Sequence, residues 1–126
     1  MIGVNSVNIS GNVKGRIVFQ KTKVKQTPAC SFSIVSDRKG PNGAKYSTSI
    51  KINAYGENLT NLCDKMLTKG AYVFIQGELM NRPGIHGELT EVRANQIIFN
   101  PNPKDPLDKS SPHSAISEEV YVTDEE

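Results

Sequence analysis

Basic side chains recur at every second position in one segment near the N-terminus. Lys21, Lys23 and Lys25 are separated by Thr22 and Val24, and the segment follows the apolar residues Ile17 and Phe19. Successive side chains of an extended chain point to opposite faces, so the three ammonium groups are predicted to share one side of a strand. A single lysine is typical of a solvated surface. The alternating row instead favours contact with the phosphates of a polyanion.

The charge of the chain is divided unevenly between its body and its C-terminal end. Residues 1–100 hold 13 Lys and Arg against 6 Asp and Glu, a net charge of +7. Residues 101–126 hold 2 against 7, a net charge of −5, and the two parts sum to the overall +2. A basic body indicates a polyanionic partner. The acidic end is either inert solubilising chain or a competitor for the same basic surface.

Catalysis finds little support in the sequence. His86 stands in a turn flanked by glycines and His113 in a polar, proline-containing stretch, and neither has Cys, Asp or Glu neighbours at metal-ligand spacing. The carboxylates are scattered, and there is no Gly-rich phosphate loop. We therefore expect a protein that is not an enzyme and that has neither a metal nor another cofactor.

The cysteines and the N-terminus bear on the compartment. Cys30 and Cys63 lie far apart among apolar residues, which favours buried free thiols in a reducing compartment over a disulfide. The N-terminus has no basic segment followed by an apolar one, and no stretch is apolar enough to span a membrane. A cytoplasmic protein is expected.

Hydrophobic periodicity predicts strands through most of the body. Alternation of apolar and polar residues indicates a first strand around Val7 and Ile9, a second around Phe32 and Ile34, and a third over residues 46–55. Two further strands are predicted around residues 73–79, with Gly77 as a bulge or bend, and over residues 89–99. Residues 37–45 have the glycine and proline chemistry of a loop.

One amphipathic helix is predicted between the third and fourth strands. Its apolar residues follow the spacing i, i+3, i+4, i+7, i+8, namely Leu59, Leu62, Cys63, Met66 and Leu67. Gly70 is placed to end it. Five strands with a helix in this position are typical of an all-β OB-fold, a five-stranded Greek-key barrel, although a short α+β sandwich would give the same order of elements. Residues 1–100 form this domain, and the prolines and polar residues of 101–126 predict a disordered acidic tail.

Five segments carry motifs in a definite order. They are residues 4–12, 29–34, 52–59, 67–79 and 90–92. The segment 52–59 covers the junction from the third strand to the helix, and the most informative segment is 67–79, which contains the run Lys-Gly-x-x-Val-x-Ile-x-Gly-x-Leu. Over residues 4–98 the chain resembles the bacterial and phage-type single-stranded-DNA-binding protein family. The resemblance implies an OB-fold that binds single-stranded DNA without strong sequence preference during replication, recombination or repair. It also implies a homotetramer, with a dimer as the alternative, and contacts with other replication or recombination proteins.

The chain departs from that family in its aromatic residues and at its end. It has no tryptophan, and Ser49 and Gly84 stand where the family usually has one, whereas Tyr55 stands where the family keeps an aromatic. The family's tail ends in acidic residues and a Pro-Phe pair that docks on partner proteins. Here the corresponding partner-binding residues would be Asp124, Glu125 and Glu126, without that pair.

Binding of single strands without sequence preference requires cations for phosphates and flat π-faces for bases. The candidate DNA-binding residues are Lys21, Lys23, Lys25, Arg38, Lys39, Lys45, Lys51, Tyr55, Arg82 and Arg93. Tyr55 is the stacking candidate because it shares the outward parity of Lys45 and Lys51. Tyr46 has the other parity, which favours the core or the barrel end. With few aromatics, affinity is expected to depend mainly on charge.

The remaining aromatic residues are assigned by their parity and by their apolar neighbours. Phe19, Phe32 and Phe99 are expected in the core, whereas Tyr72 and Phe74 would pack a subunit interface or meet DNA. The alternative is an OB-fold accessory or scaffold protein of a primosome-type replication assembly, which would act mainly through protein contacts. The missing tryptophans favour that alternative, and the basic body opposes it.

Overall fold

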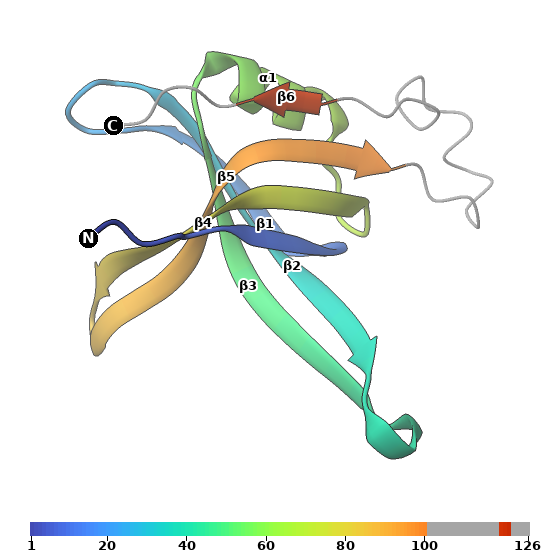
Figure 1. Ribbon diagram of the computed structural model, residues 1–126. Coiled ribbons are helices and arrows are strands. Elements are labelled where there is room, and N and C mark those ends of the chain that lie inside the picture. Colours follow the sequence, from blue (N-terminus) through green and yellow to red (C-terminus); the bar gives the residue numbers. More distant parts are fainter. Residues whose placement is uncertain (101–118, 122–126) are drawn as a thin grey trace.

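The computed structural model describes residues 1–100 and 119–121 (Figure 1). Its elements are β1 (Val7–Lys21), β2 (Pro28–Lys39), a short 3-10 turn (Pro41–Gly43), β3 (Lys45–Tyr55), α1 (Glu57–Met66), β4 (Tyr72–Gly84), β5 (Gly87–Asn100) and β6 (Glu119–Tyr121). The predicted order of three strands, one helix and two strands is confirmed for the body of the chain. So is the predicted barrel.

The barrel closes through pairing between strands that are distant in the sequence. The strand order is β3-β2-β1-β4-β5-β6, and a parallel pairing of β3 with β5 joins Ile52 to Val92 and Asn53 to Arg93. β1 pairs with two strands: its first half pairs with β4 and its second half with β2. The chain must pass very close to β2 where these halves meet. A methyl group on Gly11 would overlap the carbonyl oxygen of Val35, so this position requires glycine.

The core lies inside the barrel and beneath α1, which covers one end of it (Figure 1). The largest buried side chains come from β2, β3, α1, β4 and β5 and are Phe32, Ile34, Ile52, Leu59, Val73, Ile75, Val92 and Ile97. α1 contributes four of the five residues that its spacing predicted, and the fifth, Leu67, is buried directly after the end of the helix. Cys63 of α1 and Cys30 of β2 are both buried and free, as expected. The neighbouring Cys30 thiol and burial raise the pKa of Cys63, which keeps this thiol protonated.

Lys21, Lys23 and Lys25 do not share one side of a strand. The prediction that they lie in an extended segment is wrong for Lys23 and Lys25. β1 ends at Lys21, and Lys23 and Lys25 lie in the turn that leads to β2. The turn is fixed by two backbone bonds between Thr22 and the residues that follow: Thr22 N donates to Thr27 O (2.8 Å), and Gln26 N donates to Thr22 O (3.1 Å). Local hydrogen bonding therefore reverses the chain where alternation predicted extension.

Two long hairpins project from the barrel, β2–β3 and β4–β5 (Figure 1). The loop predicted at 37–45 is shorter than expected: residues 40–44 form it, whereas residues 37–39 and 45 belong to paired strands, with unbroken register from Ala29–Tyr55 to Lys39–Lys45. In β4–β5 a bulge shifts the register opposite Gly77, as predicted for that glycine. Leu79 is exposed instead of sharing the buried face of Val73 and Ile75, although its cross-strand partner Val92 is buried. Phe19 is also exposed, contrary to its expected place in the core, whereas Phe32 and Phe99 are buried.

One short stretch of residues 101–126, the part predicted to be a disordered tail, is described as a strand. Residues 119–121 form β6, which pairs antiparallel with β5 at Gln96, Ile97 and Ile98. β6 therefore occupies the edge of the sheet that β5 would otherwise leave open. The rest of the predicted tail, including Asp124, Glu125 and Glu126, lies outside the described residues.

Candidate nucleic-acid interface

A buried polar network lies on the outer side of the β3–β5 closure. The Ser31 hydroxyl donates to Asn53 Oδ1 (3.0 Å), and Asn53 Nδ2 donates to Glu91 Oε1 (2.7 Å). Asn53 and Glu91 are only 2% and 4% exposed. The pairing of β2 with β3 sets Ser31 opposite Asn53, and the pairing of β3 with β5 brings Glu91 near the same amide. An amide held at both ends in this way fixes the position of the carboxylate.

Glu91 in turn holds two of the predicted DNA-binding cations. Arg82 Nη1 lies 3.3 Å from its Oε1, and Lys51 Nζ lies 3.9 Å from its Oε2. The carboxylate is buried, but the side chains of Lys51 and Arg82 are 43% and 40% exposed. The buried carboxylate of Glu91 thus holds both cations on the protein side, while much of each side chain remains exposed to solvent. A phosphate can approach them without displacing Glu91.

Arg93 is the third cation of this surface. Its Nη1 lies 3.7 Å from Glu78 Oε2, and its guanidinium carbon lies 5.7 Å from the centre of the Tyr55 ring. We call Lys51, Arg82 and Arg93 the network cations. They come from β3, β4 and β5, so strand pairing brings together residues that are up to 42 positions apart in the sequence. A cation over an aromatic face is attracted by the ring quadrupole, which orients both groups.

Tyr55 does not have the exposure that its parity predicted. It keeps the outward parity, but only 8% of it is exposed, and its ring lies beside Arg93. Outward parity implies solvent exposure only where nothing covers the strand, and here the adjoining β5 carries a long side chain against the ring. The predicted exposure is wrong. The role of Tyr55 in binding DNA stays a prediction.

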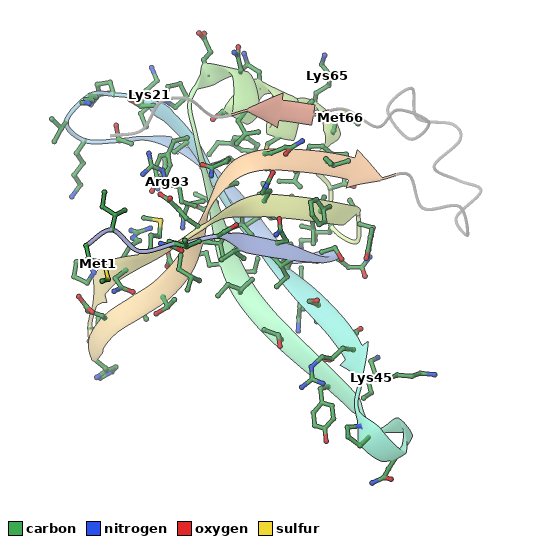
Figure 2. All side chains as sticks on the ribbon, viewed as in Figure 1. Met1, Lys21, Lys45, Lys65, Met66 and Arg93 are labelled. Atoms are coloured by element: carbon green, nitrogen blue, oxygen red, sulfur yellow. The ribbon has the colours of Figure 1, made fainter. Side chains whose placement is uncertain are left out.

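Lys21, Lys23 and Lys25, the turn cations, lie at the β1–β2 turn. All three are exposed. Within residues 1–100 none of them makes an ion pair. Their charge is therefore uncompensated in the described part of the chain and available to phosphates. In Figure 2, Lys21 lies at one end of the molecule and Lys45 near the tip of a hairpin at the other, so one short stretch of DNA could not contact both.

The β2–β3 hairpin carries a third set, Arg38, Lys39 and Lys45, which we call the hairpin cations. Lys45 Nζ lies 3.6 Å from Asp37, and the Ser47 hydroxyl donates to the same carboxylate. That hydrogen bond, followed by the charge of Lys45, lowers the pKa of Asp37. The outer part of the hairpin, residues 37–47, therefore has three cations against one carboxylate that stays ionised.

Tyr46 also lies on this hairpin and not in the core or at the barrel end. It is 47% exposed, and the guanidinium carbon of Arg38, its direct cross-strand neighbour, lies 4.9 Å from the ring centre. Its parity is that of the core residues Ile50 and Ile52, as predicted. The hairpin has left the barrel by this point, so the inward direction faces solvent. The interpretation of Tyr46 as a core residue is wrong for that reason.

Neither a metal site nor a membrane-spanning helix is found among the residues that the structure describes. Residues 1–100 contain no group of three or more His, Cys, Asp or Glu side chains that could hold a metal ion. Over the same residues, no helix is both long and apolar enough to cross a membrane. The polar groups that do converge are the network around Glu91 and the cations on the two hairpins.

Comparison with known proteins agrees with this geometry. Residues 4–99 match the model of the single-strand binding protein family. The chain is 28% identical over 130 residues to "Single-stranded DNA-binding protein 2" of Chlorobaculum tepidum, and the match covers 97% of this chain and 83% of that protein. It is also similar to the structure of a Plasmodium falciparum SSB complex with ssDNA, with a TM-score of 0.65 and 21% identity over 75% of this chain and 88% of that one. At this identity the structural similarity shows the fold.

We predict that Asn53→Ala destabilises the fold. The substitution removes the amide between Ser31 and Glu91 and leaves a buried carboxylate without its shortest hydrogen bond. A buried polar group that loses its partner costs about 1–3 kcal/mol. Urea unfolding followed by circular dichroism measures the change in free energy. Ser49→Ala, at an exposed position of the same strand, is the matched control and should change it by less than about 0.5 kcal/mol. Equal stability of the two variants would contradict a structural role for the network.

Proposed function

The chain belongs to the single-strand binding protein family, and from this we propose that it binds single-stranded DNA without strong sequence preference. The observation that carries the proposal is the family match over residues 4–99. This range includes α1 and all five barrel strands, except for the last residue of β5. Two relatives support it, since one is named for single-stranded DNA and the other was solved in complex with it.

Several of the candidate cations lie on elements with which OB-folds bind oligonucleotides, and this supports the proposal. OB-folds bind oligonucleotides on the face of strands 2 and 3 and with the loops that join strands 1 to 2 and 4 to 5. The turn cations occupy the first of these loops, Lys51 stands on β3, and Arg82 stands on the β4–β5 hairpin. Phosphate contacts carry no sequence information, so a surface built mainly of them binds without strong sequence preference.

The proposed role is protection of single-stranded DNA during replication, recombination or repair, in the cytoplasm. We propose no catalytic step for this role, because a protective binder needs only affinity for the strand. Fluorescence polarisation with labelled oligo-dT and with its duplex counterpart tests the proposal. Tight binding to the single strand alone is the expected result. Failure to bind either one would favour the scaffold function, in which the protein acts through other replication proteins.

We predict that affinity falls steeply with salt and that the turn cations contribute to that slope. For single strands the slope of log affinity against log salt is about −0.7 per neutralised phosphate. Replacing Lys21, Lys23 and Lys25 by alanine should therefore make the slope shallower by up to about 2. Titrations of labelled oligo-dT over a salt series measure it. Lys65→Ala/Lys69→Ala removes two lysines outside the turn, one in the last turn of α1 and one after it, and is the control that should leave the slope near its original value.

The acidic tail is proposed to compete with DNA for the basic surface. If it does, deleting residues 101–126 should tighten DNA binding at low salt, and the gain should vanish at high salt, where charges are screened. The deletion also removes β6 from the edge of β5. A second variant, Asp124→Asn/Glu125→Gln/Glu126→Gln, therefore keeps β6 and lowers only the charge. Oligo-dT affinities at two salt concentrations measure both. Unchanged or weaker binding by both variants would overturn the competition.

Self-association is proposed as a homotetramer, with a dimer as the alternative. Its support is an outward aromatic and aliphatic patch of Tyr72, Phe74 and Ile98, in which Phe74 and Ile98 are direct cross-strand partners. Aromatic residues are enriched in protein interfaces. Sedimentation velocity should show a species of about four chains, and Phe74→Glu should reduce it to smaller ones. A monomer at all concentrations would contradict the proposal.

A further inference from the structure

The tip of the β2–β3 hairpin holds an aromatic ring in a fixed position outside the barrel. Beyond Ile50 both faces of β3 are exposed, from Lys45 to Ser49. Tyr46 is therefore not part of the core, and 47% of its surface is exposed. An exposed aromatic at a place with no folding role is a candidate for binding a ligand.

The ring is positioned by two neighbours. Gly40 lies directly against it, since a methyl group there would overlap Cε2 of the ring and lie 2.8 Å from Cδ2. Gly40 does not adopt a positive φ, so a side chain at this position would not strain the backbone but would displace the ring of Tyr46. Arg38 approaches the same ring to 4.9 Å from across the strand pair. A side chain that is already ordered loses less entropy when it binds.

The charges around the ring are those that a nucleotide requires. Arg38 and Tyr46 point to one side of the hairpin, and Lys39 and Lys45 form the next cross-strand pair on the opposite side. Lys45 points away from the barrel in Figure 2. A guanidinium plane and an aromatic ring both accept a stacked base, and the lysines supply cations for its flanking phosphates. Carboxylates would repel phosphate, and the one carboxylate of the hairpin, Asp37, is held by Ser47 and Lys45.

We propose that Tyr46, with Arg38, forms a base-stacking platform that binds one unpaired base of single-stranded DNA. The platform rests on the proposed function and names a contact that the candidate residues taken from the sequence did not include. It is separate from the network cations, because it lies on the hairpin beyond the end of the barrel. Bases in a duplex are already stacked and enclosed, so the platform favours single strands over duplex.

The test compares variants that change the ring without changing the charge. Tyr46→Leu removes the π-face, and Gly40→Ala keeps the tyrosine but displaces its ring. Each should weaken binding to oligo-dT by about fivefold to tenfold, the lower part of the range measured for stacked bases. Tyr46→Phe keeps the ring and should bind like the original protein. Since no charge is lost, the salt slope should stay the same in all three variants.

An oligonucleotide of abasic sites, with phosphates but no bases, separates stacking from other effects. On this ligand Tyr46→Leu, Gly40→Ala and the original protein should bind equally. Equal binding of all variants to oligo-dT would overturn the platform, and so would an equal loss on oligo-dT and the abasic strand. Failure of the original protein to bind oligo-dT would instead refute the proposed function. Thermal unfolding of each variant checks that the barrel, which these residues do not enter, is intact.

Discussion

The parallel pairing of β3 with β5 is the constraint on which the rest of this molecule depends. Ile52 and Val92 face inward from it and are almost fully buried, so it completes the wall around the core. Asn53 and Arg93 face outward from the same two steps of the ladder. Because the pairing is only two residues long, its outer side is reinforced by side chains, and the amide of Asn53 joins β3 to Glu91 of β5 by a hydrogen bond. The pairing of β3 with β5 thus closes the barrel on its inner side and positions residues of the candidate nucleic-acid interface on its outer side.

Glu91 is a buried carboxylate that lies beneath a surface proposed to bind a polyanion, where a negative charge would be expected to repel the ligand. An unpaired buried charge is costly, whereas one with hydrogen bonds and counter-charges is tolerated. Glu91 receives an amide hydrogen bond and faces two cations whose outer parts remain in solvent. Lys and Arg have long, flexible side chains, and ordering them for a ligand loses entropy. The carboxylate orders them beforehand. Its own repulsion of phosphate is weakened because both cations stand between it and the solvent.

The sequence predicted the barrel because its elements follow simple periods. Alternation located the strands, the spacing of Leu59, Leu62, Cys63 and Met66 located α1, and Gly77 marked the bulge. It could not predict the network, since Ser31, Asn53 and Glu91 are ordinary polar residues that meet only through long-range strand pairing. No local signal distinguishes them. The lysine run was misinterpreted because alternation does not detect the hydrogen bonds that reverse the chain after Thr22.

The two tyrosines show why parity alone does not assign an aromatic. Parity gave the direction of both side chains correctly, but exposure depends on what lies opposite. Tyr55 points outward yet is covered by its neighbours, and Tyr46 points along the inward side yet is exposed because the hairpin continues past the barrel. A strand's inner and outer sides are defined only while it encloses a core. Beyond that limit both sides become surface, which doubles the area that a hairpin offers to a flexible strand. A chain without tryptophan thereby gains an accessible ring at a position where the core sets no constraint on it.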